Sequence, residues 1–306
     1  MNHKHSLNMS LLPQLGGTGV ALVTPFTSNG AVDFPALERM IGFVIDGGVE
    51  YIVTLGTTGE TPTIDKQEKT DIIQYTYEKV NGRVPVVVGI GGNDTAGLVK
   101  DLHHFPLGKA AAVLSASPYY SKPSQEGLFR HYEVLARESP KPVILYNVPA
   151  RTGRNITAAT TIRLAKEVPN IGGIKEASGD MQQCMEILRD RPKDFMVVSG
   201  DDGLSLSQIA CGMDGVISVA ANSFPAAFSQ MVRLCLKNEF AAATKIQYGL
   251  LEAYDHLFVE NNPAGVKAFL FEMGLIENSL RLPVVPVSAA LQEKIGKLVK
   301  RFRKEG

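Results

Sequence analysis

The sequence predicts an α/β protein, a (βα)8 TIM barrel with a C-terminal helical appendage. Eight apolar, β-branched runs recur over the first three quarters of the 306 residues. Segments with helical periodicity separate these runs, as expected for parallel strands joined by helical crossovers. After about residue 225 only helical patterns follow. Eight strand and helix alternations in roughly 220 residues fit a closed barrel better than the alternative, an open doubly wound sheet.

The predicted strands are continuous apolar runs, which is typical of strands that are covered on both faces. They are 19–26, 49–60, 84–92, 110–120, 142–149, 171–178, 195–202 and 215–222. The sixth run, "IGGIKEAS", is unusual because its apolar part ends in a lysine. The ammonium of lysine is strongly hydrated and costly to remove from water, so this residue needs an explanation.

Helices are predicted between the strands. Asp33 precedes apolar residues at helical spacing, and Asp65 with Glu68 forms the pattern of a capping box. Similar periodicity occurs at 124–138, 157–167 and 181–190, and in the last quarter at 226–240, 241–259, 263–276 and 288–302. The predicted division is an N-terminal arm (1–17), a barrel domain (18–236) and a C-terminal helical domain (237–306).

Charge balance, the N-terminal segment and the cysteine spacing exclude several classes of protein. Basic and acidic residues balance at 31 each, so the electrostatic footprint of a nucleic-acid-binding protein is missing. The N-terminal arm, expected to be frayed or loosely docked, is too short in its apolar stretch for a signal peptide or a membrane span. Cys184, Cys211 and Cys235 form neither a disulfide framework nor a zinc pattern. We expect a cytoplasmic protein without nucleic-acid or membrane partners.

The active site of a barrel of this kind lies at the C-terminal ends of its strands. Polar residues end most of the predicted strands: Thr57, Thr58, Glu60, Tyr119, Tyr120, Tyr146, Asn147, Arg151, Lys175, Glu176, Asp201, Asp202 and Asn222. This end of the barrel is therefore the predicted site.

Lys175 is the first candidate for chemistry. Its neighbours Gly172 and Gly173 are expected to leave room beside it, and Ile174 makes the surroundings apolar. Partial burial would favour the neutral amine, which attacks a carbonyl to form a Schiff base. The alternative is an ordinary strand-end lysine that reaches solvent or pairs with Glu176.

Hydroxyl groups and an arginine accompany this lysine. Imine chemistry requires repeated proton transfers, and Tyr146, Thr57 and Tyr120 could relay protons without adding a charge. The "GTTG" turn at 56–59 offers backbone N–H groups to a small carboxylate. Arg151 could bind a second carboxylate in a planar fork. Taken singly, each residue has an ordinary structural alternative as a half-buried hydroxyl, a loop or a surface arginine.

Other patterns are weaker. "GIGGND" departs from the dinucleotide-binding fingerprint because Asp94 occupies the place of its last glycine. Asp201 and Asp202 could hold a divalent metal, but no histidine ends another predicted strand.

Six motifs, in order along the chain, resemble those of the dihydrodipicolinate synthase family, in the class I aldolase superfamily that includes N-acetylneuraminate lyase. They are "GTTGE", "SPYYSKPSQEGLFRHY", "YNVPARTG", "GIKEASGD", "VSGDD" and "GVISVAAN". The resemblance extends from about residue 18 to the C-terminus. Each motif lies at a predicted strand end, and together the six are specific.

The resemblance implies a lyase that condenses pyruvate with L-aspartate 4-semialdehyde to 4-hydroxy-tetrahydrodipicolinate, on the diaminopimelate route to lysine, without a metal or organic cofactor. Lys175 would form the Schiff base with pyruvate, and Tyr146 would donate and accept protons. Thr57 would connect Tyr146 to Tyr120, which would reach into the neighbouring subunit's site. A homotetramer, built as a dimer of dimers, is implied.

The resemblance also implies substrate contacts. Thr58 would hold the pyruvate carboxylate, and Ile217 would line the pyruvate pocket through its backbone. Arg151 would recognise the semialdehyde near the pocket entrance. Gly200 is expected among the substrate-binding residues.

Alternatives remain for the reaction. N-acetylneuraminate lyase and 2-keto-3-deoxy sugar acid aldolases share the fold and the lysine. Arg151 favours the synthase, because sialic-acid-cleaving relatives typically lack an arginine after "YN-x-P". A metal-dependent barrel lyase or isomerase would use Asp201 and Asp202. A non-catalytic carboxylate-binding protein would use Lys175 only to pair with its ligand.

Regulation is predicted to differ from that of lysine-inhibited family members, whose allosteric pocket at the dimer interface has histidine and glutamate ligands. The matching positions hold Lys66, Lys69 and Gly97, while Asn93 and Tyr119 are retained. A cationic pocket without glutamate should repel the ammonium of lysine. Weak or absent feedback inhibition follows.

Overall fold

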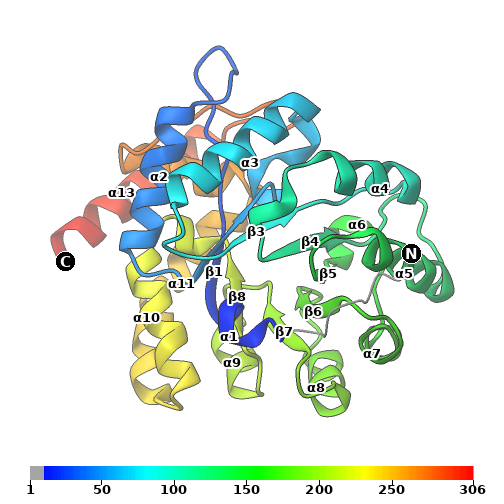
Figure 1. The fold of residues 1–306 in the computed structure, drawn as a ribbon. Coiled ribbons are helices and arrows are strands. Elements are labelled where there is room, and N and C mark those ends of the chain that lie inside the picture. The colour runs from blue at the N-terminus through cyan, green and yellow to red at the C-terminus, as the bar shows by residue number, and fades with distance from the viewer. Residues whose placement is uncertain (1–9, 306) are drawn as a thin grey trace.

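A computed structural model describes residues 10–305, and its strands form one closed parallel barrel in chain order (Figure 1). The strands are β1 (Gly17–Ala21), β2 (Tyr51–Thr54), β3 (Val86–Gly89), β4 (Ala112–Ala116), β5 (Val143–Asn147), β6 (Ile171–Glu176), β7 (Met196–Ser199) and β8 (Gly215–Ser218). β8 pairs with β1 and closes the barrel. The predicted fold class is confirmed, and each strand lies within, or within two residues of, one of the eight predicted runs.

Helices follow the strands and surround the barrel, as the periodicity predicted (Figure 1). The α-helices of the barrel are α2 (Phe34–Asp46), α3 (Lys66–Val80), α4 (Thr95–His104), α5 (Gln125–Glu138), α6 (Pro149–Thr152), α7 (Ala158–Glu167), α8 (Met181–Asp190), α9 (Ser205–Ala210) and α10 (Pro225–Leu236). Short 3₁₀ helices are η1 (Thr57–Gly59), η2 (Thr61–Thr63), η3 (Leu107–Lys109) and η4 (Ala220–Asn222). The capping box of Asp65 and Glu68 at the start of α3 is confirmed.

Apolar side chains form two layers because residues along a strand alternate between its faces. One cluster fills the barrel interior and includes Ile144, Tyr146, Val198 and Ile217. The other lies between the strands and the surrounding helices. The interior is therefore a packed core. A substrate can approach it only from the open end of the barrel, at the C-terminal ends of the strands.

The start of the chain closes the opposite end of the barrel. Helix α1 (Leu12–Leu15) lies below the strands in Figure 1. Leu11 and Leu15 are 3% and 0% exposed and belong to the interior cluster. The expectation of a frayed or loosely docked arm is therefore wrong for residues 11–15, because their leucines complete the core. The rest of that expectation, for residues 1–9, lies outside the described residues.

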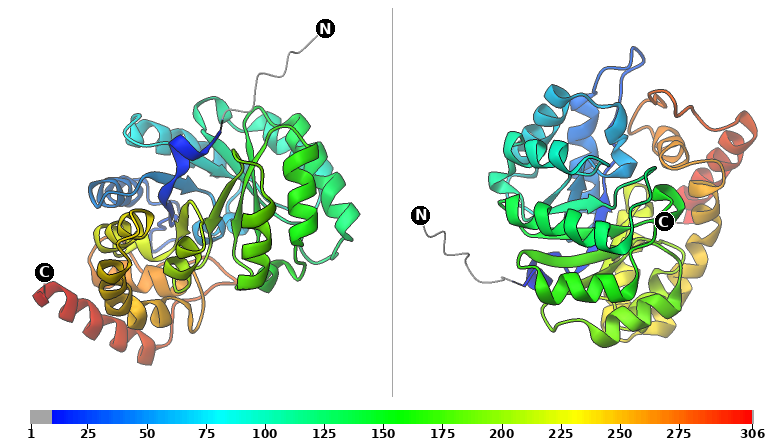
Figure 2. Two further views of the ribbon diagram at one scale, coloured as in Figure 1. Left: turned by 90° about the horizontal axis from the view of Figure 1, so that it is seen from below. Right: turned by 90° about the vertical axis from the view of Figure 1, so that its right-hand side faces the viewer.

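Three helices form the C-terminal appendage: α11 (Phe240–Phe258), α12 (Ala264–Glu272) and α13 (Ala289–Glu305). They lie together on one side of the barrel, next to α10 (Figures 1 and 2). We propose the predicted boundary between residues 236 and 237 as the division, since it falls between α10 and α11. Among residues 10–305, no helix has the length and apolar character needed to cross a bilayer.

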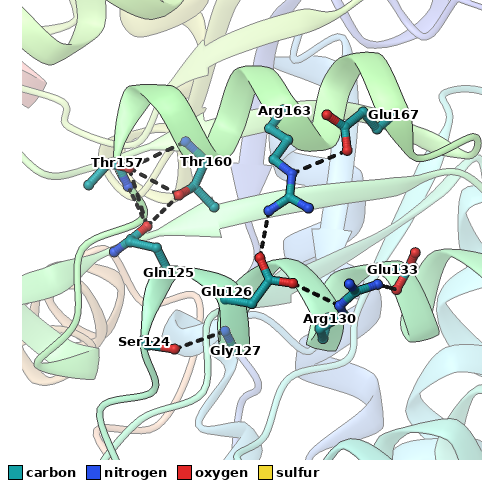
Figure 3. A network of polar contacts seen from close by, with 10 residues as sticks. All are labelled: Ser124, Gln125, Glu126, Gly127, Arg130, Glu133, Thr157, Thr160, Arg163 and Glu167. Atoms are coloured by element: carbon teal, nitrogen blue, oxygen red, sulfur yellow. Dashed lines mark hydrogen bonds and ion pairs between the residues drawn. The ribbon is translucent and has the colours of Figure 1, made fainter.

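Polar contacts connect α5 to α7 on the outside of the barrel (Figure 3). A chain of ion pairs, with N–O distances between 2.6 and 3.1 Å, joins Glu133, Arg130, Glu126, Arg163 and Glu167. At the N-terminal ends of both helices, Gln125 Oε1 accepts hydrogen bonds from Thr157 and Thr160. Exposed ion pairs contribute little stability each, so this network chiefly sets the relative position of two helices.

His131 predicts a specific pH dependence of stability. It is 4% exposed in α5, its Nδ1 lies 2.8 Å from Thr95 Oγ1, and burial lowers its pKa to about 4. The unfolded state, with an ordinary histidine pKa near 6.5, binds the proton first. Stability should therefore fall as the pH drops from about 6.5 to 4, by up to about 3 kcal/mol from this residue.

Urea unfolding of the wild type and His131→Gln at pH 7 and pH 4.5 measures this contribution. The variant should lose less stability between the two pH values than the wild type. His103→Gln is the matched control, because His103 is 58% exposed. Equal losses for His131→Gln and the wild type would contradict the prediction.

Candidate active site

Lys175 and Tyr146 lie side by side at the C-terminal ends of neighbouring strands. The two residues are direct partners in the β5–β6 pairing. Lys175 Nζ lies 4.4 Å from the centroid of the Tyr146 ring, and the two residues are 4% and 7% exposed. The structure thus brings together the predicted nucleophile and the predicted proton-transfer group inside the barrel.

A bulge near the start of β6 decides which way Lys175 points. The pairing between β5 and β6 skips Gly172, so β6 has one extra residue there. An inserted residue reverses the alternation of side chains beyond it. As a result Ile171 and Ile174 both pack in the outer layer, and Lys175 faces the interior beside Tyr146. Without the bulge, uninterrupted alternation would direct Lys175 toward the helices.

Space for the lysine comes from Gly200, which follows β7. A Cβ atom on Gly200 would lie 2.8 Å from Lys175 Cε. Gly172 instead packs against the segment that leads into α1, and Gly173 packs against the backbone of β7. The prediction that Gly172 and Gly173 leave room beside Lys175 is therefore wrong. Both glycines instead allow close packing earlier in β6, before Lys175 is reached.

Glu176 faces away from Lys175, into the layer between strands and helices. Its carboxylate accepts hydrogen bonds from Ser178 N at 2.6 Å, Asn147 Nδ2 at 2.9 Å and Gln183 Nε2 at 3.1 Å. These partners occupy the carboxylate and connect β5, β6 and α8. The alternative in which Lys175 pairs with Glu176 is therefore wrong, and the Asn147–Glu176 bond instead fixes the register that aligns Lys175 with Tyr146.

The predicted carboxylate-binding residues share a partner that the sequence did not reveal. Thr58, in η1, is 2% exposed, and its Oγ1 accepts a hydrogen bond from Asn262 Nδ2 at 3.1 Å. Arg151, in α6, donates to the backbone carbonyl of the same Asn262 at 3.1 Å. Asn262 precedes α12, so a residue of the appendage connects the loop after β2 to the loop after β5.

The predicted relay of hydroxyl groups is not joined by hydrogen bonds within the described part of the single chain. Thr57 is half-buried at the start of η1. Tyr120 is 89% exposed and has a left-handed backbone, with φ of 71°. Within residues 10–305 the structure shows no hydrogen bond that joins Thr57 to Tyr146 or Tyr120. The outward exposure of Tyr120 leaves its side chain available to a second subunit.

Asp201 and Asp202 act as caps in the turns after β7 and β8. Asp202 is 2% exposed and accepts hydrogen bonds from Ser218 Oγ at 2.6 Å and Ala220 N at 2.9 Å, and burial raises its pKa to about 6. Asp201 Oδ1 accepts from the N–H of Leu204 at 3.0 Å. These carboxylates are directed at local donors rather than at a common point. In the described part of the chain, no three His, Cys, Asp or Glu side chains gather as metal ligands would.

Comparison with known proteins assigns the family. The model of the dihydrodipicolinate synthetase family matches residues 14–302. The chain belongs to this family. The resemblance predicted from six motifs is thus confirmed over nearly the full length of the chain.

Individual members of the family are similar to this chain over nearly its full length. The 4-hydroxy-tetrahydrodipicolinate synthase of Flavobacterium psychrophilum is 48% identical over 288 residues, which cover 94% of this chain and 98% of the relative. The crystal structure of dihydrodipicolinate synthase from Thermotoga maritima has a TM-score of 0.90 at 39% identity, with 94% and 98% of the two chains covered. A structure described as a monomeric dihydrodipicolinate synthase variant has a TM-score of 0.92 at 37% identity, with 95% and 98% covered.

Proposed function

We propose that this member of the dihydrodipicolinate synthetase family is a lyase that condenses pyruvate with L-aspartate 4-semialdehyde to 4-hydroxy-tetrahydrodipicolinate, in lysine and diaminopimelate biosynthesis. The observation that carries the proposal is the placement of Lys175 beside Tyr146 at the open end of the barrel. Full-length similarity to relatives that are named for this reaction supports the same choice.

In the proposed mechanism Lys175 Nζ attacks the ketone carbon of pyruvate, and loss of water gives an imine. Lys175 is 4% exposed, and a low-dielectric pocket strengthens the polar contacts within it. Tyr146 transfers protons during loss of water, formation of the enamine and release of product. The enamine carbon then attacks the aldehyde of the second substrate. The amino group of that substrate attacks the imine carbon, which closes the ring and releases the lysine amine. No metal or organic cofactor takes part.

The substrate carboxylates are assigned to the two regions that Asn262 connects. Thr58 and the backbone N–H groups at the start of η1 bind the pyruvate carboxylate, because the first N–H groups of a helix lack partners within it. Arg151 binds the semialdehyde through its guanidinium. Ile217, in the interior cluster, and Gly200 complete the pyruvate pocket.

The proposed assembly is a homotetramer formed as a dimer of dimers. Tyr120 supports a dimer as the smallest active unit, because its exposed side chain is available to complete a Tyr146–Thr57–Tyr120 relay in a second subunit. We place the protein in the cytoplasm, where its free cysteines would remain reduced.

The aldehyde partner tests the proposal. Purified protein is given pyruvate with L-aspartate 4-semialdehyde, N-acetylmannosamine or D-glyceraldehyde, and products are identified by mass spectrometry. We expect kcat/KM to be at least about a hundredfold higher for L-aspartate 4-semialdehyde, since a site built to bind a charged group rejects analogues without it. A preference for either sugar-type aldehyde would move the chain to the related aldolases.

Arg151→Ala should affect the second substrate more strongly than pyruvate. Loss of a hydrogen bond to a charged group predicts a decrease of about 10- to 100-fold in kcat/KM for L-aspartate 4-semialdehyde. Adduct formation with pyruvate should decrease much less, because Arg151 reaches the pyruvate loop only through its hydrogen bond to the backbone of Asn262. Arg130→Ala, on the outside of α5, is the matched control. An equal decrease in pyruvate adduct formation for Arg151→Ala would contradict its assignment to the semialdehyde.

Feedback inhibition by lysine is expected to be weak or absent. Lys66 pairs with Asp101 at 2.9 Å, and burial lowers the pKa of the neighbouring Lys69. Gly97, whose N–H donates to the Asp94 carboxylate at 3.1 Å, adds no carboxylate to this site. Steady-state rates with 1 mM and 10 mM L-lysine should match the rate without it, within about 20%. Half-inhibition below 1 mM would contradict the prediction.

A further inference from the structure

A buried ion pair connects the appendage to the loop after β2, and the proposed reaction does not use it. Lys267 Nζ, in α12, lies 2.5 Å from Oε1 of Glu60, which follows η1, and the two side chains are 0% and 1% exposed. Oε2 of Glu60 accepts the N–H of Arg281 at 3.1 Å, and Lys267 also donates to the carbonyl of Ser279 at 3.0 Å. Three segments of the chain therefore meet at this pair.

Stability alone is a poor explanation for the pair. Burial lowers the pKa of Lys267 to about 8 against the attraction of Glu60, and Arg281 adds to the lowering. The ring of Phe26 lies close to both cations, with its centroid 4.1 Å from Lys267 Nζ and 4.3 Å from Arg281 Cζ, and Arg281 also pairs with Glu68. Apolar residues of the same volume often stabilise a core as well as a buried ion pair does. The pair therefore calls for a second role.

The geometry of the loop suggests that role. Leu55 and Glu60 bracket η1 and both have left-handed backbones, with φ of 56° and 55°. Bulky residues seldom adopt this conformation, and it persists only where the surrounding structure enforces it. Thr57 and Thr58 lie between them. The appendage thus holds this loop at Glu60, and again at Thr58 through Asn262.

We propose that the Lys267–Glu60 ion pair is a positioning device through which the appendage holds Thr57 and Thr58 in the conformation that binds the pyruvate carboxylate. The inference rests on the proposed function. Lys267 contacts no reacting atom and acts through Glu60 and η1, so it is a positioning residue. The appendage is then part of the pyruvate site rather than only a cover for the barrel.

A set of charge-removing variants separates positioning from stability. Lys267→Met and Glu60→Gln each leave a buried charge without its partner and should lower both the unfolding midpoint and kcat/KM for pyruvate. The double variant, Lys267→Met with Glu60→Gln, contains no such charge and should regain the wild-type midpoint. If the pair positions the loop, kcat/KM for pyruvate in the double variant stays at least about tenfold below wild type. The KM for the aldehyde should change less than about twofold.

Lys297→Met is the matched control, because Lys297 pairs with Glu293 at 2.7 Å on the exposed face of α13. It should leave the midpoint and both kinetic constants unchanged. If the first double variant does not fold, Lys267→Gln with Glu60→Gln provides the same comparison, since two amides can hydrogen-bond in place of the charges.

Wild-type kcat/KM for pyruvate in a folded double variant would overturn the inference. The dependence of borohydride-trapped adduct on pyruvate concentration distinguishes this failure from failure of the proposed function. A wild-type chain that forms no adduct on Lys175 refutes the proposed function. A wild-type chain that forms the adduct, with the same pyruvate dependence as the double variant, refutes only the positioning role.

Discussion

Lys175→Met is expected to abolish the condensation while leaving the barrel folded. The kcat/KM for pyruvate should fall by at least about a thousandfold, because methionine has no nitrogen that can form an imine. Methionine has a similar length and is easily buried beside the Tyr146 ring. The unfolding midpoint should therefore stay the same or rise, since an amine is costly to bury. Steady-state kinetics together with thermal unfolding checks both expectations.

The matched control is Lys141→Met. Lys141 precedes β5 at the opposite end of the barrel, where its Nζ donates to the carbonyl of Gly108 at 2.8 Å. This variant should retain the wild-type rate within about twofold, because it removes a lysine that is remote from the open end. Activity in Lys175→Met within about tenfold of wild type would contradict the assignment of the nucleophile.

Tyr146→Phe is expected to slow catalysis without removing the imine. The change keeps the ring that Lys175 Nζ approaches at 4.4 Å and removes only the hydroxyl group. General acid–base catalysis by one side chain typically contributes about 10²- to 10⁴-fold, so kcat should fall by at least about a hundredfold. The adduct with pyruvate should still form, but more slowly. Single-turnover trapping with borohydride separates the two effects.

Tyr51→Phe is the matched control for Tyr146→Phe. Tyr51 begins β2, is 0% exposed and belongs to the same interior cluster, and burial raises the pKa of its hydroxyl. Removal of that buried hydroxyl should change kcat by less than about twofold. If Tyr146→Phe had the same small effect as Tyr51→Phe, Tyr146 would not be the proton-transfer group.

The fold could be predicted because its signals are local. Parallel strands covered on both faces appear as continuous apolar runs, and amphipathic helices appear as a period of 3.6 residues. Capping residues such as Asp65 mark helix starts within a few positions. The docking of Leu11 and Leu15 could not be predicted in this way. It depends on the shape of the N-terminal end of the barrel, to which strands distant in the sequence contribute.

The candidate site could be predicted only in part. Strand ends place Lys175, Tyr146 and Thr58 near one another in any barrel of this kind. The bulge at Gly172, which turns Lys175 inward, is a property of pairing between strands, and "IGGI" is equally compatible with regular pairing. Asn262 lies 204 residues from Thr58 along the chain, and no local pattern connects them.

Lys267 could have been found by the same signal as Lys175. It interrupts the apolar segment "AGVKAFLF", just as Lys175 interrupts "IGGIKEAS". A lysine inside an apolar segment indicates either chemistry or a buried partner. The structure distinguishes the two cases, because Lys267 has a carboxylate at 2.5 Å whereas Lys175 lies over an aromatic ring.

Covalent trapping with borohydride tests whether Lys175 forms an imine with pyruvate. The purified protein is incubated with pyruvate and sodium borohydride, with and without a chelator, and the added mass is mapped to its peptide. We expect one reduced pyruvate adduct, on Lys175, formed equally in the presence of the chelator. Absence of an adduct, or an adduct on a different lysine, would show that Lys175 is not the nucleophile.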